Sequence, residues 1–324
     1  TILGLSAMPT DHPLNAGMLG MHGNYGPNVL TNDCDVLIAV GMRFDDRVTG
    51  RLDKYAKQAK VIHLDIDPSE IDKNVKATVG IWGDCKETLP LLTELVDRKS
   101  HTAWLQRFKD YYRQEVEAVI QDELNPTSGQ ITMGEVMKLL NQLTGGNAII
   151  VTDVGQHQMV ACRYARFNES KSNITSGGLG TMGFGLPAAI GARFGAPDRT
   201  VVAIIGDGGF QMTLQELGTI MQSEVNVKIL ILNNRFLGMV RQWQELFNDR
   251  RYSFVDIASP DFVMVAKGYG IAGQSVEKRE DLQAALKAML DHKGAYLLEV
   301  FTGKENNVFP MVPQGCSVSE IRLK

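Results

Sequence analysis

The stretch of residues 206–234 constrains the fold of this chain more than any other. It opens on Gly-Asp-Gly-Gly directly after residues 201–205, a short run that is rich in β-branched side chains and carries no charge. Such a run suits a strand that is buried on both faces of a parallel sheet. A helical pattern over 213–221, a second apolar run over 227–232 and a final pair of asparagines follow. This order predicts two neighbouring parallel strands of an α/β fold.

Asp207 and Asn234 stand at the carboxyl ends of these two predicted strands. Ligands of open parallel sheets bind beyond the carboxyl ends of the strands, so we expect both side chains to face one site. A carboxylate and an amide oxygen suit Mg²⁺, which proteins hold through one or two carboxylates together with substrate phosphates. We interpret the pair as a Mg²⁺ site that tethers a diphosphate. The alternative is two ordinary strand-to-loop turns, where Asp, Asn and Gly are common.

The whole arrangement resembles the signature of thiamine diphosphate enzymes, in which Gly-Asp-Gly is followed by a helix, a strand and an asparagine. The resemblance implies that Asp207 and Asn234 are Mg²⁺ ligands. It also implies that the backbone carbonyl of Phe236 is the third protein ligand.

Composition bounds the class of protein. The chain has 324 residues, which is enough for two domains. Its net charge of −4 does not indicate the basic surface that nucleic-acid binding requires. No apolar run approaches the length of a membrane span. Four scattered cysteines without metal-type spacing are typical of reduced thiols in a cytoplasmic protein. Because the sequence opens on Thr1 without an initiator Met, we expect it to be a fragment that has lost an N-terminal region.

The first hundred residues predict a partial domain with a parallel sheet. Strands are expected over 34–41, 60–68 and 77–84, followed by a helix over 85–96. This pattern is typical of half a Rossmann-type layer, but no Gly-x-Gly-x-x-Gly opens it, so an ordinary NAD site is not supported. The acids at the strand ends, Asp65 and Asp84, suit a ribose or an adenine edge, or else simple helix N-caps.

The rest of the chain predicts a linker and a second domain. We expect residues 101–128 to form a linker that begins with a surface helix, and residues 129–324 to form a diphosphate-binding domain with a C-terminal tail. A helix from Thr132 carries a capping-box pattern with Glu135, and Ser259 is expected to cap a later helix. The predicted fold class is therefore α/β, with two Rossmann-like parallel-sheet domains. The tail after residue 308 is a Pro-bearing extension that we expect to fold over the site.

A glycine-rich loop over 176–187 precedes the central stretch. It has too many glycines for a helix interior, while its Leu, Met, Phe and Pro argue against a flexible linker. We expect it to press backbone groups against a planar ligand.

With these pieces together, the sequence resembles the catalytic subunit of acetohydroxyacid synthase (acetolactate synthase). The resemblance covers essentially the whole chain. It rests on residues 17–23, 43–47, 65–67, 155–159, 175–185, 206–234 and 238–244. The Arg-Phe-Asp-Asp-Arg segment at 43–47 and the Met-Val-Arg-Gln-Trp-Gln segment at 239–244 are the most specific, because the metal motif alone indicates only the wider thiamine diphosphate superfamily.

The resemblance implies three sets of site residues. For a FAD that serves no net redox step, it implies Leu19, Gly20, Met21, His22, Gly41, Met42, Arg43, Phe44, Asp45, Asp65, Ile66, Asp84 and Cys85. For thiamine diphosphate, it implies Gly155, Gln156, His157, Gly180, Met182, Asp207, Gly208, Gly209, Asn234 and Met239. The catalytic set is Met182 as the wedge that bends the cofactor, Met239, and Trp243 as the residue that shapes the pocket for the second 2-oxo acid. The plainer alternative for Met182 and Trp243 is core packing.

The implied activity is decarboxylation of pyruvate and condensation with a second 2-oxo acid, pyruvate or 2-oxobutyrate. The product would be acetolactate or acetohydroxybutyrate, in the biosynthesis of branched-chain amino acids. The resemblance further implies a cytoplasmic homodimer or larger homo-oligomer, with a small regulatory subunit as a possible partner. It places a catalytic glutamate in a preceding domain of the partner chain, so we expect the fragment alone to be inactive. Rival hypotheses are another thiamine diphosphate enzyme (glyoxylate carboligase, pyruvate oxidase or decarboxylase) and a non-catalytic nucleotide-binding scaffold.

Overall fold

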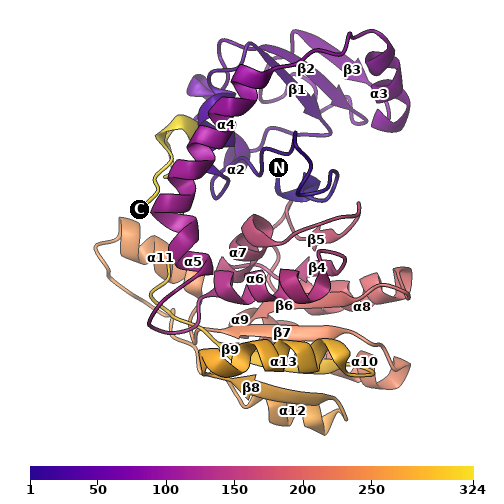
Figure 1. Cartoon of the computed structure of the whole chain (residues 1–324), viewed down its shortest axis with the longest axis vertical. Helices are drawn as coiled ribbons and strands as arrows, with labels where there is room; N and C mark the ends of the chain where they lie inside the picture. The colour runs from indigo at the N-terminus through magenta and orange to yellow at the C-terminus, as the bar shows by residue number, and fades with distance from the viewer. The chain divides into compact units, whose positions relative to one another are not determined.

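The computed structural model describes all residues from 1 to 324 and divides into two compact units (Figure 1). Unit 1 comprises residues 16–119 and 309–324 together with Thr1, and unit 2 comprises residues 2–15 and 120–308. Each unit has its own all-parallel sheet, so the predicted fold class is confirmed. The domain limits differ from those drawn from the sequence, because the first residues pack with unit 2 and the tail packs with unit 1. No helix has the length and apolarity that crossing a bilayer requires.

Unit 1 is built on three parallel strands in the order β1-β2-β3. The strands are β1 (Val36–Val40), β2 (Lys60–Asp65) and β3 (Val79–Trp82). The helices are α1 (Tyr25–Thr31), α2 (Asp46–Thr49), α3 (Cys85–Glu94) and α4 (Thr102–Glu115), with short 3₁₀ turns at η2 (Leu52–Lys54) and η5 (Val318–Glu320). One sheet face covers a small core that includes Phe44, Tyr55 and Val61, and Val318 of the tail contributes to the same core.

Unit 2 is built on six parallel strands in the order β5-β4-β6-β7-β9-β8. They are β4 (Ile149–Thr152), β5 (Asn173–Thr175), β6 (Val201–Gly206), β7 (Lys228–Asn233), β8 (Ala272–Val276) and β9 (Tyr296–Phe301). The helices are α5 (Gln121–Leu124), which follows a π turn at 116–120, α6 (Met133–Thr144), α7 (Gln156–Tyr164), α8 (Gly185–Gly195), α9 (Asp207–Thr213), α10 (Leu217–Ser223), α11 (Gly238–Phe247), α12 (Phe262–Gly268) and α13 (Arg279–Asp291). Short 3₁₀ turns lie at η1 (Ile2–Gly4) and η4 (Leu214–Glu216).

The central strands of unit 2 are apolar on both faces because helices cover both. Val202 and Ile204 of β6 face a core shared with α6, α7 and α13. Val201, Ala203 and Ile205 face a second core shared with α8, α9, α10 and α12. All of these side chains are buried, so β6 reads as a continuous apolar run rather than an alternating one.

The strand order fixes where a ligand site forms. From β4 the chain moves outward to β5 and then returns to add β6 on the other side of β4. The connections therefore diverge at the carboxyl ends of β4 and β6, which is the position where open α/β sheets bind ligands. Helices α7 and α9 begin directly after these two strands.

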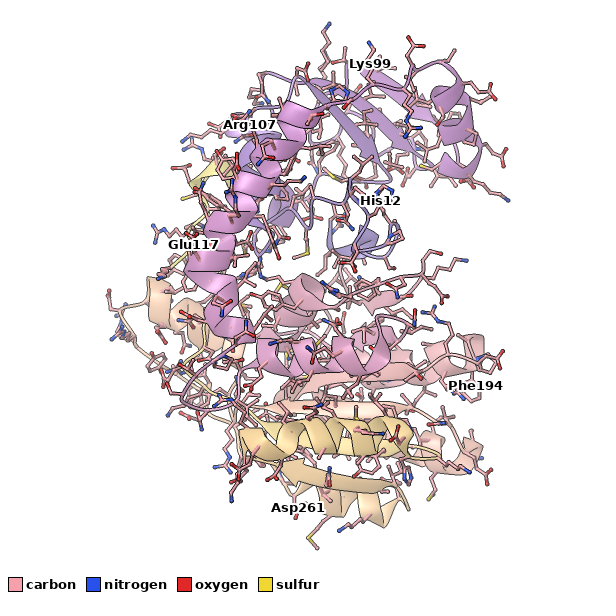
Figure 2. The ribbon with its side chains drawn as sticks, viewed as in Figure 1. His12, Lys99, Arg107, Glu117, Phe194 and Asp261 are labelled. Atoms are coloured by element: carbon pink, nitrogen blue, oxygen red, sulfur yellow. The ribbon has the colours of Figure 1, made fainter.

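Three local predictions were wrong in detail. The helical run over 213–221 is not one helix, because α9 already begins at Asp207 and the η4 turn separates it from α10. Ser259 does not cap α12. Asp261, which Figure 2 labels, caps it by accepting a hydrogen bond from the Met264 N–H at 2.8 Å.

Thr132 caps α6 as predicted, but the reciprocal half of the capping box is missing. The carboxylate of Glu135 accepts hydrogen bonds from Arg279 Nε instead, at 2.8 and 3.0 Å. An ion pair to a distant helix has replaced the local contact that the sequence pattern predicted.

Leu230 lies in the middle of β7 with no exposed surface. We expect Leu230→Ala to lower the free energy of unfolding of unit 2 by about 2–5 kcal/mol, because it leaves a cavity in the core. Urea unfolding followed by circular dichroism measures the change. Met264→Ala on α12, where the side chain is 68% exposed, is the matched control and should stay within about 0.5 kcal/mol. Similar losses in both variants would contradict the assigned core.

Candidate functional site

Asp207 is a buried carboxylate at the carboxyl end of β6, with only 1% of its surface exposed. Ser259 Oγ donates a hydrogen bond to Asp207 Oδ2 at 3.1 Å. Burial raises the pKa of Asp207 to about 6, although Ser259 and the backbone N–H groups of Gly208 and Arg235 favour its charged form. The carboxylate is therefore held by hydrogen bonds but carries a charge that no basic side chain neutralises, which is the condition that a bound cation relieves.

Asn234 lies beside Asp207 at the end of the neighbouring strand, because Gly206 of β6 pairs with Leu232 of β7. Asn234 Nδ2 donates to Gln156 Oε1 at 3.3 Å, and Asn234 Oδ1 accepts from the Phe236 N–H at 3.0 Å. Asp207, Asn234 and Phe236 all line one cavity of about 50 Å³. This space is that of a few water molecules, so it suits a cation and a phosphate group rather than a whole cofactor.

The cavity brings together most of the residues predicted for the diphosphate site. The predicted residues that line it are Gly155, Gln156, His157, Met182, Asp207, Gly208, Gly209, Asn234, Phe236 and Met239. The other lining residues, which the sequence analysis did not assign to the site, are Met133, Val154, Gly206, Leu232, Leu237, Gly238 and Val240. Gly180 and Trp243 lie outside the lining; Trp243 is half-buried, and its ring packs on Phe247 with 4.9 Å between ring centroids.

Asp153, at the carboxyl end of β4, organises the glycine-rich loop and was missed by the sequence analysis. Its Oδ1 accepts from the Gly183 N–H at 3.1 Å and its Oδ2 from the Gly185 N–H at 2.8 Å. A Cβ on Gly209 would lie 2.3 Å from Asp153 Oδ1, so only glycine fits there. Asp153 thereby fixes both residues that flank Phe184, and with them the position of Met182.

His157, in the first turn of α7, is buried against glycines of two strand ends. A Cβ on Gly155 or on Gly206 would lie 2.9 Å from the imidazole, so both glycines make room for the ring. Burial lowers the pKa of His157 to about 4, partly offset by the carboxylate of Asp153, so the ring is neutral at pH 7. Its Nε2 is buried without a hydrogen-bond partner, and the residue lines the cavity. An unpartnered buried nitrogen is costly, and a phosphate oxygen is a suitable partner.

Gln156 is committed to the protein rather than open to a ligand. Its Nε2 donates to Gln242 Oε1 at 3.0 Å and to the Asn306 carbonyl at 3.2 Å, while its Oε1 accepts from Asn234. Gln242, fully buried on α11, exchanges two hydrogen bonds with the backbone of Val308. This network leaves no amide proton of Gln156 for a diphosphate. It orients Asn234 and ties the segment after β9 to the site.

The residues predicted for FAD lie in unit 1, several of them at one edge of its sheet. Gly41 follows β1, Asp65 ends β2 and Asp84 follows β3, so the three stand at neighbouring carboxyl ends. In the loop of residues 19–22, the Gly20 N–H and carbonyl both bond the side chain of Asn28, at 2.9 Å each.

Two of the FAD residues have local roles that compete with ligand binding. Phe44 is 1% exposed and packs edge-on against Tyr55 and His63, so its ring belongs to the core of unit 1. The ring is therefore closed to a ligand, and the prediction that Phe44 takes part in a FAD site stays a prediction. Asp84 caps α3 by accepting from the Lys86 N–H at 2.9 Å, which confirms the plainer alternative for this acid.

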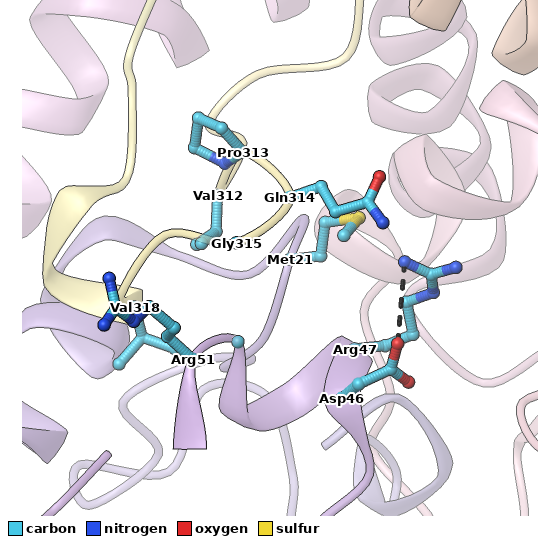
Figure 3. Close-up of a pocket in the computed structure, with 10 residues that line it drawn as sticks. Met21, Asp46, Arg47, Arg51, Val312, Pro313, Gln314, Gly315 and Val318 are labelled. Atoms are coloured by element: carbon cyan, nitrogen blue, oxygen red, sulfur yellow. Dashed lines mark ion pairs between the residues drawn. The ribbon is translucent and has the colours of Figure 1, made fainter. Parts of the chain in front are cut away.

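A second cavity in unit 1, of about 200 Å³, lies between the α2 region and the tail (Figure 3). Arg47, Arg51 and residues 312–315 are among its lining residues, and Arg47 pairs with Asp46 at 3.9 Å. The tail is held there by the Val312 N–H, which donates to the Met21 carbonyl at 2.8 Å. Of the predicted FAD residues, only Met21 lines this cavity.

Comparison with protein families identifies both units. Residues 153–300 match the family described as thiamine pyrophosphate enzyme, C-terminal TPP binding domain, and residues 1–92 match the central domain of the same enzymes. The chain belongs to the thiamine pyrophosphate enzymes. Thiamine pyrophosphate is the same molecule as thiamine diphosphate, so the cavity at Asp207 falls in the domain that binds this cofactor in the family. The unpartnered His157 Nε2 and the unneutralised Asp207 fit a diphosphate accompanied by a cation.

The individual relatives that the chain matches are acetolactate synthases. The chain is 44% identical to acetolactate synthase isozyme 2 large subunit of Escherichia coli, over all of this chain and 58% of the relative. It is 42% identical to chloroplastic acetolactate synthase 1 of Nicotiana tabacum, over 99% of this chain and 50% of the relative. It is also 42% identical to the probable acetolactate synthase large subunit of Methanocaldococcus jannaschii, over 99% and 55%. The predicted resemblance to acetolactate synthase is confirmed, and the chain spans about half the length of these curated relatives.

Ser259 should hold the carboxylate of Asp207 in the orientation that a predicted metal ligand needs. We expect Ser259→Ala to weaken Mg²⁺-dependent binding of thiamine diphosphate about three- to tenfold, because a hydrogen bond that orients Asp207 is lost. Ser259→Thr keeps the hydroxyl and should restore most of the affinity. Titration of Mg²⁺ at fixed cofactor, read by isothermal calorimetry, measures the change. Equal losses in the Ala and Thr variants would argue for a packing role instead.

The raised pKa of Asp207 gives a pH signature in the cofactor-free chain. The unfolded state, with the ordinary pKa of 3.8, loses its proton before the native state, whose pKa is about 6. Stability should therefore fall by about 2–3 kcal/mol as pH rises from about 4 to 6, and then stay level in this respect. Urea unfolding at several pH values measures it, and Asp207→Asn should lack this part of the decline. A decline of the same size in Asp207→Asn would show that other groups cause it.

Proposed function

We propose that this chain carries the acetolactate synthase reaction as part of a catalytic subunit. The reaction is decarboxylation of pyruvate and condensation with a second 2-oxo acid, pyruvate or 2-oxobutyrate. The observation that carries the proposal is the buried carboxylate of Asp207, which no basic side chain neutralises and which lies beside Asn234. Both residues lie at the carboxyl edge of the sheet in a thiamine pyrophosphate binding domain. The relatives named acetolactate synthase over the whole chain support the choice of reaction.

Asp207, Asn234 and the carbonyl of Phe236 would hold Mg²⁺, and the diphosphate would complete its coordination. When bound, thiamine diphosphate supplies the nucleophilic carbon and the electron sink for decarboxylation of a 2-oxo acid. His157 Nε2, neutral and without a protein partner, would bond a phosphate oxygen. The N-terminus of α11, whose residues 238–240 line the cavity, adds a favourable end of a helix dipole for the negative diphosphate.

Three further residues would shape the site and exclude water from it. Met182 lies in a loop that Asp153 fixes through two backbone N–H groups. Because the loop is held rigidly, the thioether of Met182 would press on the cofactor without moving away. Met239 adds a second apolar wall to the cavity. Trp243, one turn further along α11 and outside the cavity, would contact the second 2-oxo acid beyond the cofactor.

FAD would bind unit 1 along the carboxyl edge of its sheet. Support comes from the glycine at the end of β1, which has open space around it, and from the acids at the ends of β2 and β3. Asp65 is buried and accepts from the Asp67 N–H, so it presents a fixed carboxylate to a ribose. The buried ring of Phe44 would serve only as the support of this edge.

The proposal also covers the partners, the location and the missing catalytic group of the whole enzyme. The relatives carry about as much sequence again outside the matched region, and five of them are named large subunits, one as a probable one, which favours a small regulatory subunit as partner. Assembly into a homodimer and a cytoplasmic location are further parts of it. The family resemblance assigns the glutamate that protonates the cofactor to another domain, contributed by the partner chain. The 324 residues alone should therefore bind cofactor without turning over pyruvate.

The test separates binding from turnover. The chain should bind thiamine diphosphate in the presence of Mg²⁺, and Asp207→Ala should weaken this binding at least tenfold because the metal loses its carboxylate. Asp249→Ala, at a surface carboxylate, is the matched control and should bind normally. Calorimetry measures both, and a product assay follows.

The product assay uses the chain extended by the N-terminal region that the longer relatives carry. The extended protein should convert pyruvate to acetolactate, and the 324 residues alone should not. Acetaldehyde, acetyl phosphate or tartronate semialdehyde as the product would instead favour another thiamine diphosphate enzyme. No cofactor heat from the extended protein would favour the scaffold hypothesis.

A further inference from the structure

Unit 2 has a second cavity at the opposite edge of its sheet, where strands β6 and β7 begin. It measures about 230 Å³ and is lined at its two strands by Val201 and Lys228. The remaining lining residues are Arg193, Pro197, Asp198, Arg199, Thr200, Asn226 and Leu290. Phe194, labelled at the end of α8 in Figure 2, follows Arg193 in the chain and marks this side of the unit. None of these residues takes part in the cofactor site.

Lys228 is buried at the start of β7, with 4% of its surface exposed. Its Nζ donates to the carbonyls of His292 and Gly294 at 2.7 and 2.6 Å, just beyond the end of α13. An ammonium group has three protons, so these two bonds leave one donor. Burial and the nearby charge of Arg193 lower the pKa of Lys228 to about 8, so it is largely charged at pH 7 without a carboxylate partner.

The two arginines of the cavity are also anchored to backbone carbonyls and not to acids within it. Arg193 Nη1 donates to the Arg199 carbonyl at 2.7 Å, and Arg193 forms no ion pair. Arg199 Nη2 donates to the Asn147 carbonyl and to Ser172 Oγ, at 2.9 and 2.8 Å, while its Nη1 lies 3.7 Å from exposed Glu169. Arg199 Nε is buried without a partner. Asn226 Oδ1, in the same lining, is a second buried polar atom that lacks one.

The charge of the cavity is therefore unbalanced. Three cations line it, and Asp198 is the only carboxylate among the lining residues. The backbone carbonyls fix the cations in place, because each bond to a carbonyl uses a donor without cancelling the charge. Like charges held together in this way favour an anion that is small enough to touch all three.

We propose that this cavity is a binding site for a tetrahedral oxyanion of the phosphate class, held by Arg193, Arg199 and Lys228. The remaining N–H of Lys228 and the unpartnered Nε of Arg199 are donors for its oxygens. Asn226 Oδ1 accepts from the hydroxyl of a monohydrogen phosphate. The volume holds one such ion with a few waters and leaves no room for a nucleotide base. Binding stabilises the fold by mass action, because the unfolded chain lacks the three fixed cations.

The test is the stability of the chain in orthophosphate, with thiamine diphosphate and Mg²⁺ present in saturating amounts so that the cofactor site is closed to the probe. Potassium chloride of equal ionic strength is the reference. We expect orthophosphate to raise the melting temperature with a saturable dependence on its concentration. ³¹P line broadening then gives the dissociation constant directly.

Two variants should change the affinity for orthophosphate in opposite directions, and this pair of results ties the binding to the cavity. Arg193→Gln should weaken orthophosphate binding about tenfold, because a charge-assisted hydrogen bond is lost. Asp198→Asn, at an exposed position, should strengthen it about two- to fivefold by removing the opposing charge. Lys267→Gln, which removes an exposed cation of α12 outside the cavity, is the control and should leave binding unchanged.

Each outcome decides the proposal. Saturable binding that weakens in Arg193→Gln and tightens in Asp198→Asn supports it. A stabilisation equal to that of chloride, or one that changes as much in Lys267→Gln as in Arg193→Gln, overturns it in favour of general ionic effects. If Arg193→Gln fails to fold, Asp198→Asn alone still decides, because unchanged binding in that variant contradicts the site. Cofactor binding should be unaffected in every case, so failure here leaves the proposed function untouched.

Discussion

Two buried carboxylates at adjacent strand ends divide the work of the site. Asp153 accepts backbone N–H groups through both oxygens and thereby fixes the glycine-rich loop. Asp207 has a hydroxyl donor and backbone donors, but burial still raises its pKa to about 6. The first carboxylate is satisfied by the fold and so builds structure. The second is left with excess charge, which is the condition that the proposed cation would relieve.

The glycines of the motif follow from these carboxylates and from His157. Gly209 is excluded from carrying a side chain by Asp153 Oδ1, and Gly206 by the imidazole of His157. Gly238 is closed in by Gln156 Oε1, which a Cβ would approach to 2.2 Å. Sequence reading attributes such glycines to sharp turns and to the close approach of a ligand. In this site Gly206, Gly209 and Gly238 serve the close approach of the protein's own polar side chains.

The sequence predicted best what depends on neighbours along the chain. The buried strands β6 and β7 were predicted from their apolar runs, and Asp207 with Asn234 from their positions at the ends. What it missed depends on contacts between distant segments: Ser259 reaches Asp207 across 52 residues, and Glu135 leaves its capping position for Arg279. Phe44 was read as a ligand contact because its motif is specific, but only the fold shows that its ring is buried. Local pattern identifies the element, while long-range hydrogen bonds decide what each polar side chain does.

The two edges of the six-stranded sheet differ in charge for one reason, the common direction of its helices. Helices that follow parallel strands begin at the carboxyl edge, where α7, α9 and α11 present N–H groups, and end at the other edge with free carbonyls. The first edge suits a diphosphate. The second needs donors, and Lys228 supplies them beyond the end of α13, as Arg199 does just after α6. Because each carbonyl end carries only a partial charge, full cations placed there leave a positive surplus. The same geometry that builds the cofactor site thus creates an anion-attracting cavity at the far edge of the sheet.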